Sequence, residues 1–351
     1  MKIALISPLY EAVPPRLYGG TERIVAYLAD ALVNMDHSVT LFSSADARTK
    51  AMLVPQRDQA IRLDPDPLKS DIAAHLSMLH EVRARADEFD LLHFHTDLLH
   101  FPFFEDMASR TLTTLHGRLD MKDLPTCYRR WPHYPLISIS DQQRAALPNA
   151  NWFGTVHHGV SPETYRLNAK PSGEYVAFLG RISPEKRVDR AINIARRAGI
   201  PLKIAAKVDM ADRAYFLDEV QPLLRQPGVE FIGEIGDVEK SEFLGNARAL
   251  LFPIDWPEPF GLVMIEAMAC GTPVIAWRCG SVPEVVEPGI TGAIVSSEDE
   301  AIAVLKNLEL FDRRRVREEF EHRFSTTAMA QRYVALYRRL IERQIPIKCT
   351  A

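Results

Sequence analysis

The sequence contains no long apolar run. None of its segments approaches the roughly 18 apolar residues that a membrane span requires, and the run Ile3–Ile6 is too short for the core of a signal peptide. The four cysteines form no CxxC pair, so a zinc ribbon or a thioredoxin-type site has no support, and dispersed thiols fit a reducing compartment. We therefore expect a cytoplasmic protein.

An excess of basic residues is also missing. The 42 Lys and Arg against 46 Asp and Glu give a formal charge of −4, whereas a dedicated nucleic-acid binder usually carries a strong positive excess. No nucleic-acid partner is expected. The composition, 47% hydrophobic and 25% charged, is that of a globular protein and excludes a largely disordered chain. Because one core rarely grows beyond about 250–300 residues, the chain length of 351 predicts two domains.

Short apolar runs alternate with segments of helical period, in two series. This alternation is typical of βαβ units with parallel sheets. It predicts two Rossmann-like α/β/α halves, joined near residues 160–173 by a polar segment with prolines and a glycine. The predicted strands are 2–7, 39–43, 91–95, 111–115 and 136–139 in the first half, and 175–179, 202–206, 229–232, 249–252, 274–276 and 293–295 in the second. The clearest predicted helices are 21–35, 187–197, 260–268 and 328–341.

The segment PEPFGLVMIEAMACGTPV, residues 257–274, carries the strongest functional pattern. Gly261 allows the backbone to approach a ligand closely, and the start of the following helix offers unpaired N–H groups to an anion. Glu258 stands before this helix and Glu266 lies in its second turn. Carboxylates beside an anion site make sense if the ligand also has hydroxyl groups, as a sugar and a ribose do. The alternative is a buried helix with two solvated acids.

Two further segments stand where α/β folds bind ligands. Arg181 and Lys186 follow the predicted strand YVAFL, and an Arg fork with a Lys point charge suits a diphosphate. The pair Gly19-Gly20 precedes the first long helix, for which Thr21 is the expected N-cap. The alternatives are surface cations in a loop and a structural turn. No GxGxxG and no Walker A motif is present.

Histidines are placed at predicted strand ends. His93 and His95 share one face of a strand, and with His100 they could suggest a metal, but three histidines within eight residues are weak evidence for one. We therefore expect no metal site. His116, which follows the strand TLTTL, is better placed for polar catalysis or sugar binding.

Taken together, these motifs make the chain similar to the GT4 family of retaining glycosyltransferases, which have the GT-B fold. The glycine pair, Arg181 with Lys186, and Glu258-x7-Glu266 occur in the family's order, and the closing segment FSTTAMAQRYVALYRRL also fits. The resemblance implies an α/β chain of two Rossmann-like domains facing a cleft, with the C-terminal helix crossing back to the N-terminal domain. The expected domains are an acceptor domain, 1–165 with 326–351, and a donor domain, 166–325.

The resemblance also assigns roles to residues. The donor would be a nucleotide-diphosphate sugar, with Arg181 and Lys186 on the diphosphate, Glu258 on the sugar and Glu266 on the ribose. Gly20 would approach the phosphates, and residues 231–235 would contact the base. The expected catalytic residues are His116, Arg181, Lys186 and Glu258. The expected donor-binding residues are Gly19, Gly20, Arg181, Lys186, Ile232, Glu234, Glu258, Phe260, Gly261, Leu262, Val263 and Glu266.

The implied reaction is the transfer of a hexosyl unit, most readily from a UDP-sugar and next from GDP-mannose, to an unidentified hydroxyl acceptor. Two cations and a helix start would stabilise the leaving diphosphate without a metal or other cofactor, and no protein nucleophile is assigned. One departure is His158-Gly159-Val160-Ser161, where many relatives carry Asn-Gly-Val/Ile-Asp.

Two alternatives stay open. The first is a non-catalytic module that binds nucleotide sugars, although both cations and both carboxylates are intact. The second is an NAD-dependent oxidoreductase with two Rossmann domains, against which the absence of GxGxxG argues. We expect at most transient contact with a membrane surface, and the oligomeric state is left open.

Overall fold

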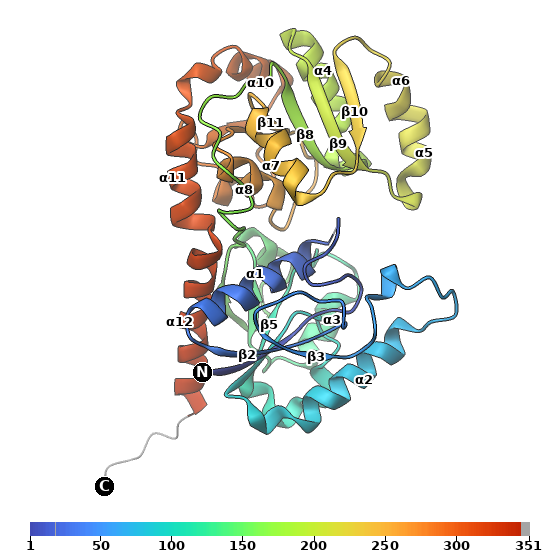
Figure 1. The fold of residues 1–351 in the computed structure, drawn as a ribbon, viewed down its shortest axis with the longest axis vertical. Coiled ribbons are helices and arrows are strands. Elements are labelled where there is room, and N and C mark those ends of the chain that lie inside the picture. Colours follow the sequence, from blue (N-terminus) through green and yellow to red (C-terminus); the bar gives the residue numbers. More distant parts are fainter. Residues whose placement is uncertain (18, 345–351) are drawn as a thin grey trace. The chain divides into compact units, whose positions relative to one another are not determined.

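The computed structural model describes residues 1–17 and 19–344, which divide into two compact units. The N-terminal unit comprises Met1–Gly159 and the chain from Thr326 on, and the C-terminal unit comprises Val160–Ser325 (Figure 1). Residues 345–351, the end of the predicted returning segment, lie outside the described residues.

A seven-stranded sheet forms the centre of the N-terminal unit, in the order β3-β2-β1-β4-β5-β6-β7. All neighbouring strands are parallel. The five predicted strands are confirmed, and the two missed strands, β3 and β7, are the edges of the sheet. β3 ends in a proline and β7 contains a glycine, so neither forms the buried apolar run that identifies a central strand. The strands are β1 (Lys2–Ile6), β2 (Ser38–Ser43), β3 (Met52–Pro55), β4 (Leu91–Phe94), β5 (Thr111–Thr114), β6 (Leu136–Ser138) and β7 (Trp152–Thr155).

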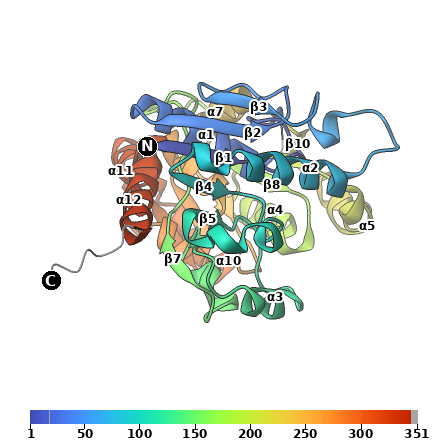
Figure 2. The same cartoon turned by 90° about the horizontal axis from the view of Figure 1, so that it is seen from below.

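The two faces of this sheet are covered by different helices. Ile6 and Phe94 share a core cluster with Met78 of helix α2. On the opposite face, His93 and Thr114 reach tyrosines of α12. Helix α12 lies alongside α1 in both views (Figures 1 and 2), so the last helix packs on the first unit as predicted. The helices are α1 (Gly20–Asn34), α2 (Asp71–Ala84), α3 (Leu124–Arg130) and α12 (Thr326–Gln344), with 3-10 turns η1 (Ile61–Leu63), η2 (Ala86–Glu88), η3 (Phe101–Phe103), η4 (Glu105–Arg110) and η5 (Gln142–Ala146).

The C-terminal unit has a six-stranded parallel sheet in the order β10-β9-β8-β11-β12-β13. Its six predicted strands are confirmed. They are β8 (Val176–Arg181), β9 (Leu202–Lys207), β10 (Val229–Gly233), β11 (Leu250–Phe252), β12 (Val274–Trp277) and β13 (Gly292–Val295). After β8, the strands β9 and β10 are added on one side of it and β11, β12 and β13 on the other. The carboxyl ends of β8 and β11 are therefore neighbours at a topological switch point.

Helices cover both faces of this second sheet. Helices α4 and α10 pack against each other and share a core cluster with β8 and β9, whereas α8 packs against α11. The helices are α4 (Val188–Ala198), α5 (Arg213–Tyr215), α6 (Gln221–Leu223), α7 (Asp237–Asn246), α8 (Leu262–Ala269), α9 (Val282–Val285), α10 (Glu298–Leu305) and α11 (Arg313–Phe324), with 3-10 turns η6 (Pro184–Lys186), η7 (Met210–Asp212) and η9 (Leu308–Leu310) and a π-helical turn η8 (Phe216–Val220). Among the described residues, no helix has both the length and the apolar character needed to cross a bilayer.

Candidate active site

In the C-terminal unit, predicted site residues from two neighbouring strand ends form one ion pair. Lys186 ends the short turn η6 after β8, and Glu258 lies in the loop after β11. Parallel strands bring their carboxyl ends to one edge, and there Lys186 Nζ forms a hydrogen bond and an ion pair with Glu258 Oε2. The side chains are 18% and 14% exposed, so the pair is largely removed from solvent.

Trp256 completes this pair. Its Nε1 donates to the same Glu258 oxygen at 2.9 Å, and its ring centroid lies 5.2 Å from Lys186 Nζ. A second ring, that of Phe252, lies 5.8 Å from the ammonium group. Aromatic faces attract a cation, so the two rings help to hold the ammonium group of Lys186 in this place. The sequence did not predict a role for Trp256, because an aromatic residue two positions before Glu258 belongs to no recognisable motif.

Arg181, the last residue of β8, is surrounded by carboxylates. Its guanidinium lies 2.6 Å from Glu185, 3.7 Å from Asp209 and 3.6 Å from Asp212. These acids hold the guanidinium at the end of the strand, and an anionic ligand would have to compete with them. Asp209 and Asp212 follow β9 without any recognisable motif, so the sequence did not predict them.

The start of helix α8 depends on Gly261. This residue is the N-cap, with φ of 79°, in the left-handed region that favours glycine. A Cβ at this position would lie 2.9 Å from Met264 Cε and 3.1 Å from Phe252 Cζ. The chain therefore turns tightly into α8, and the first N–H groups of the helix are left without intrahelical partners.

Gly280 and Ser281, which follow β12, fix the loop that carries Glu258. Ser281 N donates to Glu258 O at 3.0 Å, and Ser281 Oγ donates to Phe260 O at 2.6 Å. A Cβ on Gly280 would lie 2.4 Å from both Glu258 N and Glu258 O. The carboxylate is thus presented by a loop whose backbone is held on both sides. The sequence did not predict this support for the Glu258 loop, because its only signal is the short CGS segment after a strand.

Gly261→Ala is expected to destabilise the C-terminal unit more than Gly289→Ala. Both glycines have φ of 79°, but a Cβ at Gly289 meets nothing within 4 Å. The left-handed conformation costs each variant about 1–2 kcal/mol, and crowding adds about 1–3 kcal/mol at Gly261 alone. Urea unfolding of both full-length variants measures the difference. Equal losses would show that the neighbours of Gly261 do not constrain this turn.

Glu266 lies in a buried polar cluster on α8. It is 2% exposed, and its Oε1 accepts a hydrogen bond from Tyr165 OH at 2.9 Å. Lys240 Nζ of α7 lies 3.8 Å from the same oxygen, and Asp237 lies 3.4 Å from Tyr165 OH. A buried carboxylate requires such partners. Tyr165 and Lys240 come from distant parts of the chain, and no sequence signal had connected them with Glu266.

The other donor-binding residues predicted in this unit differ in their exposure. Phe260 is buried, whereas Leu262 and Val263 are half-buried at the start of α8. Ile232, on the edge strand β10, and Glu234, just after it, are exposed. Within residues 160–325, no hydrogen bond connects Ile232 or Glu234 with the Lys186–Glu258 pair, with Arg181 or with Glu266. Their contact with a base stays a prediction.

In the N-terminal unit, Gly19 and Gly20 begin helix α1. Gly19 is the N-cap with φ of 149°, and a Cβ on it would lie 2.8 Å from Pro15 Cβ. The prediction of Thr21 as N-cap is wrong, because the conformation of Gly19 starts the helix earlier. Glu22 in the first turn is 5% exposed, and burial raises its pKa to about 7.

His116 follows β5 and belongs to a group of histidines. Its Nε2 lies 2.8 Å from His95 Nδ1, and its ring stacks on that of His158 at 5.2 Å between centroids. Burial lowers the pKa of His116 to about 3, so the ring is neutral near pH 7. His158 belongs to the segment that departs from the family pattern, and this departure therefore adds a ring beside His116.

His93 and His100, the other two histidines considered for a metal site, form structural hydrogen bonds. His93 uses both nitrogens, with Tyr337 OH and Thr114 Oγ1 each at 2.8 Å. His100 stacks on Phe94 and lies 3.2 Å from Thr113 Oγ1. In the described part of the chain, no group of three or more His, Cys, Asp or Glu side chains could hold a metal ion. A reaction without a metal or other cofactor stays a prediction.

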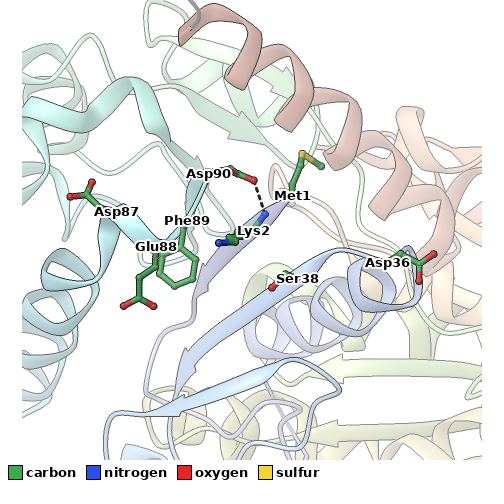
Figure 3. A pocket seen from close by; sticks show the side chains of 8 residues that line it. All are labelled: Met1, Lys2, Asp36, Ser38, Asp87, Glu88, Phe89 and Asp90. Carbon is green, nitrogen blue, oxygen red and sulfur yellow. Dashed lines mark hydrogen bonds between the residues drawn. The ribbon is translucent and has the colours of Figure 1, made fainter.

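One pocket of about 370 Å³ lies at the end of the first sheet where its strands begin, away from the predicted site residues (Figure 3). It is lined by residues at the amino ends of β1 and β2 and just before β4, and the backbone N–H of Lys2 donates to Asp90 there at 2.7 Å. Ligand sites of open parallel sheets lie at the carboxyl ends, where all the predicted site residues of this unit are found. The lining residues are Met1, Lys2, Asp36, Ser38, Asp87, Glu88, Phe89 and Asp90.

Two family models match adjoining parts of the chain. Residues 18–171 match glycosyltransferase family 4, and residues 164–329 match glycosyl transferases group 1. The D-inositol 3-phosphate glycosyltransferase of Mycobacterium marinum is 30% identical over 167 residues, which are 41% of this chain and 34% of that protein. The match thus spans about a third of the length of that curated relative.

Solved structures are similar over nearly the whole chain. AviGT4, a glycosyltransferase involved in avilamycin A biosynthesis, has a TM-score of 0.74 at 24% identity and covers 97% of this chain and 98% of its own. Anabaena HepE in complex with UDP and glucose has a TM-score of 0.74 at 18% identity and covers 97% of this chain and 100% of its own. The chain belongs to glycosyltransferase family 4 and has the GT-B fold. The predicted family, fold class and enzyme class, a transferase, are confirmed.

Proposed function

We propose that this chain transfers a hexosyl unit from a nucleotide-diphosphate sugar to a hydroxyl acceptor, with retention of the anomeric configuration. The observation that supports this most strongly is the Lys186–Glu258 pair beside the start of α8. It places a cation for a phosphate next to a carboxylate for sugar hydroxyls, which is the combination that a nucleotide sugar requires.

Lys186 and Arg181 would stabilise the departing diphosphate. When the bond between the sugar and the phosphate breaks, negative charge grows on the leaving oxygen, and fixed cations near that oxygen lower the barrier. The diphosphate would draw Lys186 away from Glu258, and the released carboxylate would accept hydrogen bonds from the sugar. The N–H groups at the start of α8 add a positive dipole end. No protein nucleophile is assigned.

Glu266 would accept hydrogen bonds from the ribose hydroxyls. The roles of His116 and of the Gly19-Gly20 pair stay predictions. A UDP-sugar is the first choice of donor because HepE, a protein of the same fold, was crystallised with UDP and with UDP-glucose. GDP-mannose is the next. The acceptor is a molecule with a free hydroxyl, and a cytoplasmic location stays a prediction.

A panel of donors tests this proposal. The full-length protein is incubated with UDP-glucose, UDP-galactose, UDP-N-acetylglucosamine and GDP-mannose, and release of the nucleoside diphosphate is measured with and without candidate acceptors. We expect slow release from one donor even when water is the acceptor, with the α-anomer of the sugar formed first. Tight binding without any release would favour the non-catalytic binding module, and binding of NAD in place of these donors would favour the oxidoreductase.

A further inference from the structure

We propose that Trp256 is a positioning residue for Glu258. Its indole N–H would hold one oxygen of the carboxylate, Oε2, after Lys186 has turned to the diphosphate, and would leave Oε1 to accept from a sugar hydroxyl. The hydrogen bond between Trp256 and Glu258 is a property of the C-terminal unit alone, whereas its use in sugar binding rests on the proposed function.

Trp256 contacts both members of the ion pair, through different parts of its side chain. Its Nε1 donates to Glu258 Oε2 at 2.9 Å, and its ring centroid lies 5.2 Å from Lys186 Nζ. The attraction between an ammonium group and a ring face does not use the indole N–H. If Lys186 moves toward a phosphate, the hydrogen bond from Trp256 to the carboxylate is therefore not broken by that movement.

Glu258 needs another hydrogen-bond donor once Lys186 has left it. Its side chain is 14% exposed, and a carboxylate so far removed from water is costly without donors. Lys186 and Trp256 both bind Oε2, and among the described residues no hydrogen bond to Oε1 is formed. Because indole is a donor only, Trp256 can keep Oε2 bound, while Oε1 stays available to the hydroxyl groups of a sugar.

The loop that carries Trp256 has little conformational freedom. Trp256 and Glu258 each precede a proline, and the residue before a proline is largely restricted to extended conformations. Asp255 N donates to Glu185 O at 2.9 Å, and Glu258 N donates to Trp256 O at 2.8 Å. The indole ring and the carboxylate are therefore carried by neighbouring residues whose backbone is fixed, and the hydrogen bond between them needs little further ordering.

The hydrogen bond can be tested without any ligand, because Lys186→Ala imitates the state in which the cation has left Glu258. Indole ¹H–¹⁵N spectra of the full-length protein, assigned with Trp256→Phe, report how fast the Trp256 N–H exchanges with water. We expect slow exchange in the wild type and in Lys186→Ala, and exchange about tenfold faster in Glu258→Ala. Equally fast exchange in Lys186→Ala and Glu258→Ala, or an unchanged rate in Glu258→Ala, would overturn the proposal.

The consequence for sugar binding is measured by comparing the active nucleotide sugar with its nucleoside diphosphate, UDP or GDP. Trp256→Phe keeps a ring beside Lys186 but has no N–H, and Glu258 would contact only the sugar. Calorimetry of Trp256→Phe should therefore show an unchanged affinity for the nucleoside diphosphate and an affinity for the nucleotide sugar lowered about tenfold. Trp256→His, whose Nε2 can take the place of the indole nitrogen, should restore most of this loss. Equal losses for both ligands, or no loss for either, would overturn the proposal.

Trp277→Phe is the matched control. Trp277 ends β12 in the same unit, and its ring centroid lies 4.9 Å from the guanidinium carbon of Arg190, so it also places a ring beside a cation. We expect both affinities to be unchanged in this variant, and thermal unfolding shows whether each variant folds. The same selective loss in Trp277→Phe would overturn the proposal. A wild type that binds neither nucleoside diphosphates nor nucleotide sugars, while the exchange rates are as expected, would instead count against the proposed function.

Discussion

Replacing Lys186 with alanine is expected to reduce glycosyl transfer by about a hundred- to a thousandfold, the size of effect found when one preorganised group that stabilises developing charge is removed. Lys186 Nζ is the cation next to Glu258, and two aromatic rings lie within 6 Å of its ammonium group, at 5.8 Å and 5.2 Å. Without it, the charge on the leaving diphosphate would be stabilised only by Arg181 and the start of α8. Initial rates of diphosphate release from the active donor measure the loss.

Lys203→Ala is the matched control for this experiment. Lys203 lies on β9 of the same unit, forms an ion pair with Glu230 at 3.0 Å and stacks over an aromatic ring, that of Tyr175. It therefore resembles Lys186 in its contacts but not in its position at a strand's carboxyl end. Thermal unfolding shows whether both variants fold. A rate for Lys186→Ala within twofold of the rate for Lys203→Ala would contradict the role assigned to Lys186.

Replacing Glu266 with glutamine is expected to weaken binding of the nucleotide by about ten- to a hundredfold. A hydrogen bond to a charged group contributes about 1.5–3 kcal/mol, and a neutral amide offers the ribose hydroxyls a weaker acceptor than a carboxylate. Since Oε1 already accepts from Tyr165, we expect Oε2 to accept the hydrogen bonds from the ribose. Calorimetric titration with the nucleoside diphosphate measures the change.

Tyr165→Phe separates this role from a structural one. It removes the same buried hydrogen bond, 2.9 Å long, but leaves the carboxylate of Glu266 in place. We expect Tyr165→Phe to lower the free energy of unfolding with little effect on nucleotide affinity. If it weakens nucleotide binding as much as Glu266→Gln does, Glu266 acts by supporting α8 and not by binding the ribose.

Much of the fold could be predicted from the sequence because central strands of parallel sheets are buried on both faces. Such strands are short apolar runs, as in residues 176–181 and 250–252, and they stand out without further information. The edge strand β3 is partly exposed and ends in a proline, and helix α2 has little difference in polarity between its faces. Neither has the periodic signal on which the prediction depends.

The site was predictable where residue type and strand position coincide. Arg181, Lys186 and Glu258 follow strands, and ligands of such sheets bind at the carboxyl ends. Their pairing was not predictable, since Lys186 and Glu258 meet only because β8 and β11 are neighbours. Trp256, Ser281 and the tyrosine beside Glu266 support the site through tertiary contacts, which a single sequence does not record.

Calorimetric titration of the full-length protein with nucleotide-diphosphate sugars, UDP-glucose first, tests the central claim most directly, namely that Lys186, Glu258 and the start of α8 form a donor site. We expect saturable binding of one donor at one site, weakened at least tenfold by Lys186→Ala and unaffected by Lys203→Ala. Absence of binding for every nucleotide-diphosphate sugar, or an affinity that Lys186→Ala leaves unchanged, would contradict it.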